Sequence, residues 1–281
     1  AKDRAPHFAM KGLHAIQMAG LSDSDGSGKA LIGHTATSVG GGQIVIIGGA
    51  VLDEVKEIAA LTSAAHLLDL PTDTWTPLQA VGAVPGPRVA HAAACVAPGK
   101  LVMHGGSMPA AGERHGHVYG ELFSLDVEGQ QAKWQAVSTS QPGPPPRYGH
   151  AVAFCHPHLV VFGGSGAHGA LADLWVLDLE SLPLTWRDVP VQSCWPQARM
   201  YHSVGTCNEG SGQGMMLMFG GRSSSRKALG DAWALRRLDD RWEWRELPAA
   251  KSERPAARCM HSCVALGSMF LIVGGCADSD V

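Results

Sequence analysis

A Gly-Gly pair ends an apolar run five times in this chain, and this repeat constrains the fold more than any other feature. The second glycines are Gly49, Gly106, Gly164, Gly221 and Gly275, at spacings of 57, 58, 57 and 54 residues. Three other residue types keep the same period: His34, His91, His150, His202 and His261; Arg88, Arg147, Arg199 and Arg258; and Trp75, Trp134, Trp186 and Trp244. A fixed period of this length indicates structural units that pack on one another.

Each unit contains four short apolar runs separated by turns, which predicts a four-stranded antiparallel sheet. Gly-Gly at a strand end permits a backbone with positive φ, and the tryptophan is large enough to fill the space between sheets. The period and these marks resemble kelch repeats. We therefore expect an all-β, kelch-type β-propeller with four-stranded antiparallel blades, six of them in the complete domain.

The predicted organisation is one propeller domain over residues 1–281. It contains four whole repeats over about 32–247, a half repeat over 248–281 and an N-terminal segment over 1–31. Either the ring is incomplete in this sequence, or the N-terminal segment supplies the missing strands. The run at 21–29, LSDSDGSGK, is typical of a solvated loop.

Composition narrows the classes of partner and compartment. The net charge of −3 gives no indication of nucleic acid or of an anionic membrane surface, and no apolar run has membrane-spanning length. The N-terminal run has no signal-peptide pattern. The seven cysteines are odd in number and form no C-x-x-C pair, so we expect buried thiols in an intracellular, cytoplasmic or nuclear protein rather than a disulfide framework.

A more specific resemblance comes from longer runs. The segments PGPPPRYGHAVAF, LADLWVLDLESLPLTWRDVP, MFGGRSSSRKALGDAWALRR and DRWEWRELP resemble the N-terminal kelch domain of the kelch-containing Ser/Thr protein phosphatases of plants, algae and apicomplexan parasites. The likeness runs from about Pro85 to the end, and 240–244 is its most specific part. It implies a parent protein with a metal-dependent phosphatase domain.

The phosphatase motifs G-D-x-H-G, G-D-x-x-D-R-G and G-N-H-E are absent from this chain. The resemblance therefore implies a regulatory or targeting propeller without catalytic residues or cofactors, with metal ions expected only in the absent phosphatase domain. The run at 112–117 contains an H-x-H pair, but its flanking arginine and its position favour a solvated loop over a metal site.

The repeated arginines are the first candidate for partner binding. If Arg88, Arg147, Arg199 and Arg258 face the mouth of the channel, they would hold an acidic or phosphorylated segment of a partner protein through their planar guanidinium groups. The alternative is that each arginine stacks on an aromatic ring or bridges two blades. We expect the repeated histidines to make structural hydrogen bonds.

The loop that contains Arg222, Arg226 and Lys227 is a second candidate for anion binding, with a plain solvated loop as the alternative. Trp242 and Trp244 share a strand face and are expected between blades. Two other functions stay open: an enzyme acting on a small molecule through groups in the channel, and a scaffold that self-associates through an open sheet edge.

Overall fold

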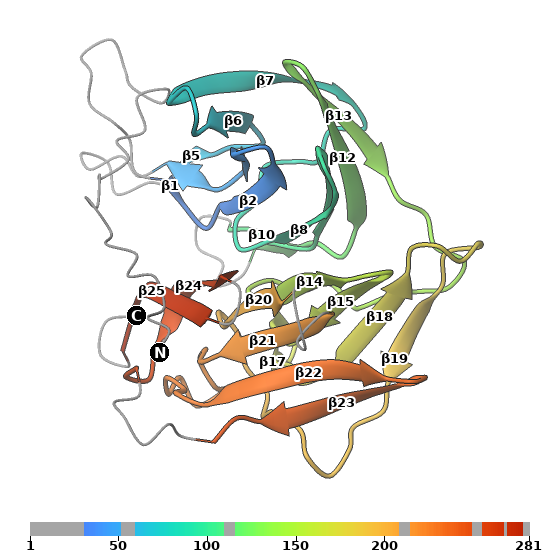
Figure 1. Ribbon diagram of the computed structural model, residues 1–281, viewed down its shortest axis with the longest axis vertical. Helices are drawn as coiled ribbons and strands as arrows, with labels where there is room; N and C mark the ends of the chain where they lie inside the picture. Colours follow the sequence, from blue (N-terminus) through green and yellow to red (C-terminus); the bar gives the residue numbers. More distant parts are fainter. Residues whose placement is uncertain are drawn as a thin grey trace, which may run out of the picture.

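The computed structural model of this chain describes residues 31–51, 60–109, 116–207, 214–248, 255–266 and 269–277. Within these ranges every regular element is a β-strand (Figure 1). None of the described segments forms a helix with the length and apolarity needed to cross a membrane. The predicted loop at 21–29, most of the N-terminal segment and most of the H-x-H run lie outside the described residues.

Sixteen of the described strands form four groups of four in chain order, and we call each group a blade. Blade 1 contains β2 (Thr35–Gly40), β3 (Gln43–Ile47), β6 (Ala65–Asp69) and β7 (Thr74–Gly82); blade 2 contains β8 (Ala92–Ala97), β9 (Lys100–His104), β12 (Leu122–Glu128) and β13 (Gln131–Ala136). Blade 3 contains β14 (Ala151–Cys155), β15 (His158–Phe162), β18 (Leu174–Asp178) and β19 (Trp186–Val189); blade 4 contains β20 (Ser203–Cys207), β21 (Met215–Phe219), β22 (Ala232–Leu238) and β23 (Arg241–Glu246). A two-stranded half-blade follows, with β24 (Cys259–Leu266) and β25 (Met269–Cys276).

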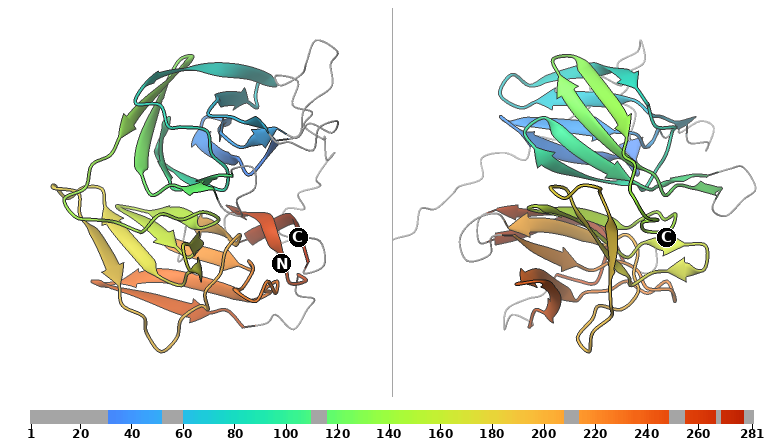
Figure 2. Two further views of the ribbon diagram at one scale, coloured as in Figure 1. Left: turned by 180° about the vertical axis from the view of Figure 1, so that it is seen from behind. Right: turned by 90° about the vertical axis from the view of Figure 1, so that its right-hand side faces the viewer.

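The blades are arranged around a common centre, with the first strand of each blade innermost (Figures 1 and 2). These first strands contact one another in the order β2, β8, β14, β20 and β24. The predicted all-β propeller with four-stranded antiparallel blades is therefore confirmed. The count of six blades and the boundaries of the single domain stay predictions.

Short hairpins follow the Gly-Gly pairs, between the second and third strands of each blade. They pair β4 (Ala50–Val51) with β5 (Ala60–Leu61), β10 (Ser107–Met108) with β11 (His117–Val118), and β16 (Ser165–Gly166) with β17 (Gly169–Ala170). The strand β1 (Leu31–Ile32), which precedes blade 1, also pairs with β4. In blade 4 the corresponding bridges join Arg222 to Met200 and to Ala228. Because strands alternate in direction, these connections and the starts of all the first strands lie at one end of the propeller.

Blades 1 and 2 share one eight-stranded sheet, which the sequence did not predict. The first half of β7 pairs with β6 in its own blade, whereas Gln79–Gly82 pair in parallel with Gln131–Trp134 of β13. The outer strands of the two blades therefore protect each other's edges. We call this pairing of β7 with β13 the seam (Figure 2).

The Gly-Gly pairs join each blade to the next one. The N–H of Gly106 donates to the carbonyl of Arg147 at 2.8 Å, and equivalent bonds join Gly49 to Arg88, Gly164 to Arg199 and Gly221 to Arg258. In the four whole repeats the first glycine of the pair has no room for a side chain: a Cβ at Gly105 would lie 2.6 Å from the carbonyl oxygen of Arg147, whereas one at Gly274 of the half-blade would meet nothing within 4 Å. Positive φ and this close approach together explain why glycine stands at these positions.

Three of the four repeated tryptophans fill the space between blades, as predicted, whereas Trp75 on β7 is only half-buried. Trp134, Trp186 and Trp244 are buried on the fourth strands of blades 2, 3 and 4. Trp242 and Trp244 of β23 both pack into the apolar cluster that blades 3 and 4 share, which confirms their expected burial. Large aromatic side chains at these positions exclude water from the interfaces between blades.

Candidate functional site

The repeated arginines lie inside the protein, behind the Gly-Gly turns. Arg147 and Arg199 have no exposed surface, Arg88 is buried, and Arg258 is half-buried. In each case Nη1 donates to the carbonyl of the first glycine in the same blade, as Arg147 does to Gly163 at 2.9 Å. Each arginine therefore fixes the turn of its own blade, while its carbonyl binds the preceding blade.

Two of these arginines form bidentate ion pairs. Arg147 donates to both carboxylate oxygens of Asp173 at 2.7 and 2.6 Å, and Arg199 donates to those of Asp231 at 2.8 and 2.6 Å. Burial alone would raise the pKa of Asp231, but the hydrogen bonds and positive charge of Arg199 outweigh it and hold that pKa below its usual value. The carboxylate thus stays ionised and compensates the buried guanidinium.

The expectation that these arginines face the channel mouth is wrong for Arg147 and Arg199, because their donors are used inside the blades. Arg88 lies 3.9 Å from the centre of the Tyr119 ring, with Glu121 3.6 Å away, so it stacks on an aromatic ring. The stacking of Arg88 on Tyr119 is one of the alternatives that the sequence left open, whereas the ion pairs of Arg147 and Arg199 within their own blades were not predicted. Contact between any of the four arginines and a partner stays a prediction.

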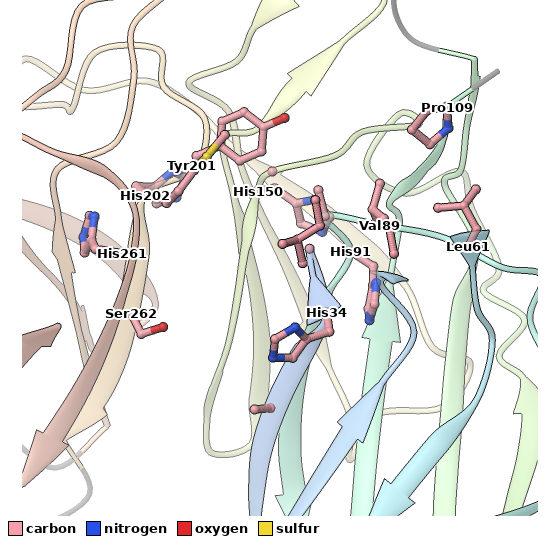
Figure 3. A pocket seen from close by; sticks show the side chains of 17 residues that line it. His34, Leu61, Val89, His91, Pro109, His150, Tyr201, His202, His261 and Ser262 are labelled. Atoms are coloured by element: carbon pink, nitrogen blue, oxygen red, sulfur yellow. The ribbon is translucent and has the colours of Figure 1, made fainter. Parts of the chain in front are cut away.

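A cavity of about 700 Å³ lies at the centre of the propeller, and all five repeated histidines line it. Figure 3 shows His34, His91, His150, His202 and His261 around this space, each from a different blade. Among the described residues that line the cavity, none is an aspartate, glutamate, lysine or arginine. This part of the wall therefore combines mainly apolar side chains with imidazole rings.

The cavity histidines are neutral near pH 7. Burial and the charge of Arg199 lower the pKa of His202 to about 3, and burial and the charge of Arg88 do the same for His91. Nε2 of His261 lies 3.1 Å from the carbonyl oxygen of Phe219 in the preceding blade, so this nitrogen carries the proton and donates it. This bond is of the structural kind expected from the sequence, although the cavity around the rings was not predicted.

A chain of backbone hydrogen bonds circles the cavity through the residues that precede the histidines. Ala90 donates to Gly33, Gly149 to Ala90, Tyr201 to Gly149 and Met260 to Tyr201, at 2.7 to 3.0 Å. All five residues have positive φ, which is costly for alanine, tyrosine and methionine. No sequence pattern indicated this chain of bonds, because the five positions hold four different residue types.

The Arg222 loop lies beside this ring of residues. Cζ of Arg222 is 5.5 Å from the centre of the Tyr201 ring, and Tyr201 lines the cavity. Nε of Arg222 is buried and has no hydrogen-bond partner among the described residues, none of which offers it a carboxylate within ion-pair distance. Ser223 and Lys227 close the loop through a backbone hydrogen bond of 2.9 Å, which leaves Arg226 and Lys227 exposed.

The described part of the site contains mainly neutral groups. In the described ranges no cluster of three or more histidines, cysteines or carboxylates has the geometry to hold a metal ion. The cavity offers neutral imidazoles and Tyr201, whose pKa is raised to about 12 by burial and by neighbouring Tyr148. What the site provides is a mainly apolar hollow of about 700 Å³ with positive charge at one side of its mouth.

Four-stranded blades around a central cavity define this protein as a β-propeller. Residues 33–275 match the KLHDC2/KLHL20/DRC7 Kelch-repeats domain, so the chain belongs to the kelch-repeat family. Kelch domains generally mediate interactions between proteins.

Two plant relatives illustrate this membership. Serine/threonine-protein phosphatase BSL2 of Arabidopsis thaliana is 32% identical over 220 residues, which cover 78% of this chain and 20% of that protein. Putative adagio-like protein 2 of Oryza sativa subsp. japonica is 32% identical over 218 residues, which cover 77% of this chain and 32% of that protein. The chain thus spans only a fifth to a third of these two relatives, and its predicted resemblance to kelch-containing phosphatases is confirmed.

Among solved structures, that of YjhT matches with a TM-score of 0.67 and 16% identity, over 89% of this chain and 78% of the matched chain. At this identity the match shows the fold alone.

Proposed function

We propose that this chain is a protein-interaction propeller whose cavity mouth binds an acidic or phosphorylated segment of a partner. The observation that carries this proposal is the buried Nε of Arg222, which has no hydrogen-bond partner among the described residues and lies beside Tyr201 at the mouth. Nη2 of the same guanidinium donates to the Met200 sulfur at 3.9 Å. A buried donor without an acceptor costs free energy, and an incoming carboxylate or phosphate would remove that cost. Exposed Arg226 and Lys227 add positive charge on the same loop.

The neutral cavity complements this charged loop. Because imidazoles with lowered pKa carry no charge near pH 7, the wall suits the apolar or uncharged part of a bound segment. The acidic group of that segment would then remain at the mouth, where the guanidinium of Arg222 is available. Affinity and salt dependence would come mainly from the loop.

We further propose that the parent protein is a metal-dependent Ser/Thr phosphatase and that this propeller directs it to its partners. The similarity to BSL2 supports this assignment. The metal ions would belong to the catalytic domain, whose motifs are absent from this chain. None of the seven cysteines forms a disulfide, which supports a reducing, intracellular location in the cytoplasm or nucleus.

The test measures binding of fluorescent peptides to the chain by anisotropy. The panel contains acidic, phosphorylated and neutral peptides of otherwise equal sequence. We expect the acidic or phosphorylated peptides to bind and the neutral ones to bind at least about tenfold more weakly, with a difference that shrinks as salt is added.

The variant for this test is the double substitution Arg226→Ala, Lys227→Ala, which removes exposed charge without disturbing the blades. The matched control is Arg236→Ala, Arg237→Ala, since these exposed arginines lie toward the opposite end of β22. Equal affinity of the two variants for the peptides, or equal affinity for charged and neutral peptides, would show that the mouth is not the recognition site.

A further inference from the structure

Two cysteines face each other across the half-blade. Cys259, the first residue of β24, lies directly opposite Cys276, the last residue of β25, and their Sγ atoms are 3.8 Å apart. Directly opposed residues of antiparallel strands have Cα atoms about 4.5 to 5.5 Å apart, within the range of about 4.4 to 6.8 Å that disulfides span. The backbone therefore already has the spacing that a bond between them needs.

The two thiols differ in their access to solvent. Cys259 is only 1% exposed, whereas Cys276 is partly exposed at the end of the outer strand. A soluble oxidant would thus react with Cys276 first. Cys259 would be the adjacent thiol that attacks the oxidised sulfur of Cys276. An exposed thiol next to a second one within contact distance is the arrangement that favours reversible oxidation over irreversible oxidation.

The other cysteines lack this arrangement. Cys155 and Cys207 are buried in blades 3 and 4, and burial raises the pKa of Cys155 to about 12. Cys263 lies on β24, but burial raises its pKa to about 11, and its Sγ accepts a hydrogen bond from Ser203 at 2.6 Å. No other pair of cysteines among the described residues has sulfur atoms in contact.

We propose that Cys259 and Cys276 form a reversible disulfide when the protein meets hydrogen peroxide. The Cys276 thiol gives a sulfenic acid while one peroxide molecule is reduced to water. The Cys259 sulfur then attacks the Cys276 sulfur, the S–O bond breaks, and a second water leaves. In total the two thiols lose two protons and two electrons, and one peroxide becomes two waters.

This disulfide would act at the wall of the central cavity. Cys259 directly precedes Met260 and His261, which both line the cavity, and Met260 receives its position from the hydrogen bond to Tyr201. A bond to Cys276 would clamp β24 to β25 at the end of the half-blade that bears these residues. Oxidation is thus a modification next to the proposed binding site, and its chemistry does not depend on that function.

The test uses the whole chain and maps the oxidation state of each cysteine. The protein is treated with peroxide, its remaining thiols are blocked with N-ethylmaleimide, and it is then reduced and labelled with iodoacetamide. Trypsin cuts after Arg258, and the sequence up to Val281 contains no further lysine or arginine, so one peptide holds Cys259, Cys263 and Cys276. Fragmentation of this peptide in the mass spectrometer assigns each label.

We expect iodoacetamide on Cys259 and Cys276 and N-ethylmaleimide on Cys263. Iodoacetamide labelling of Cys259 and Cys276 should be at least tenfold higher than in unoxidised protein. In the Cys276→Ser variant Cys259 should carry N-ethylmaleimide again. The Cys263→Ser variant should leave the labelling of Cys259 and Cys276 unchanged. Exposed Cys194 serves as the internal control, because its sulfenic acid, trapped with dimedone, shows that enough peroxide was used. The proposal is overturned if Cys194 is oxidised while Cys259 and Cys276 carry N-ethylmaleimide, or if Cys263 replaces either of them.

Discussion

The contrast between Arg199 and Arg88 shows how one acidic residue changes the role of a repeated arginine. Arg199 forms an ion pair with Asp231, whose short side chain is held in place by a 2.6 Å hydrogen bond from Trp233 Nε1. In blade 2 the corresponding residue is Glu121, which is half-exposed and contacts Arg88 only at 3.6 Å. Stacking on Tyr119 replaces the ion pair there. Arginines at equivalent positions of two blades thus hold their blades through two different interactions.

Asp231→Asn should destabilise the protein by about 3 kcal/mol, because it keeps the shape of the side chain but leaves the buried guanidinium of Arg199 without its counter-charge. Urea unfolding at pH 7 measures this loss. The matched control, Glu121→Gln, removes a partly exposed charge and should cost less than about 1 kcal/mol. Equal losses in the two variants would contradict the role assigned to the buried ion pair.

The cavity histidines should make stability depend on pH. The pKa of His202 is lowered in the folded protein to about 3, so the unfolded chain binds more protons than the folded one between about pH 6.5 and pH 3. The free energy of unfolding is therefore highest above about pH 6.5 and falls as the pH is lowered through this window. Urea midpoints from pH 7 to pH 4 would record the decline.

His202→Gln should make this decline less steep, since it removes one group that the unfolded chain protonates. His168→Gln is the control, because His168 is exposed in the turn between β16 and β17. If both variants follow the same pH dependence as the unsubstituted chain, the buried histidines do not cause it.

At the level of strands and turns, the Gly-Gly pairs explain how the blades are spaced. In the four whole repeats the first glycine of the pair lies against the arginine carbonyl and the histidine ring of the next blade, as Gly220 does against Arg258 and His261. A side chain there would push two blades apart. This is a requirement of the interface, in addition to the requirement for positive φ.

Gly220→Ala tests this by comparison with Gly129→Ala. The two glycines have nearly equal φ, 62° and 60°, but a Cβ at Gly129 meets nothing within 4 Å, whereas one at Gly220 lies 2.6 Å from the Arg258 carbonyl oxygen. Both substitutions pay the cost of positive φ, about 1 to 2 kcal/mol. Gly220→Ala should cost about 2 kcal/mol more because of the collision. Chemical denaturation gives both values, and similar losses would mean that the turn alone requires glycine.

Over the whole propeller, protection of strand edges is uneven. The seam pairs the outer strands of blades 1 and 2, whereas the described half-blade has two strands and exposes Met269, Leu271 and Val273 on one side of β25. Self-association through this edge stays a prediction, and light scattering over a range of concentrations would test it. The difference in protection also predicts a difference in local stability.

Amide hydrogen exchange should therefore be faster in β25 than in β15. The strand β15 pairs with a neighbouring strand on each side, and all its side chains are buried. Local opening of the half-blade exposes little additional apolar surface, so it costs less free energy than opening blade 3. Mass spectrometry of peptides from 158–162 and from 269–276 would measure the two rates. Equal protection would indicate that the half-blade unfolds only with the rest of the propeller.

The period of the glycines, histidines, arginines and tryptophans was sufficient to predict the blades, because each repeated residue serves the same local requirement in every unit. Gly105 must leave room for the next blade, and Trp134 must fill the gap between sheets. Because these requirements are local, the same residue type recurs at the same position of each repeat. The kelch family and the likeness to a kelch-containing phosphatase followed from the same residues.

Only the tertiary structure decided which way the repeated side chains face. The sequence placed Arg147 and His150 three residues apart but could not show that the guanidinium turns inward to Asp173 while the imidazole lines the cavity. The seam depends on the contact that places β7 beside β13, and the chain of backbone bonds through Ala90, Tyr201 and Met260 depends on four blades and the half-blade at once. Such features arise from contacts between units, and no single repeat contains them.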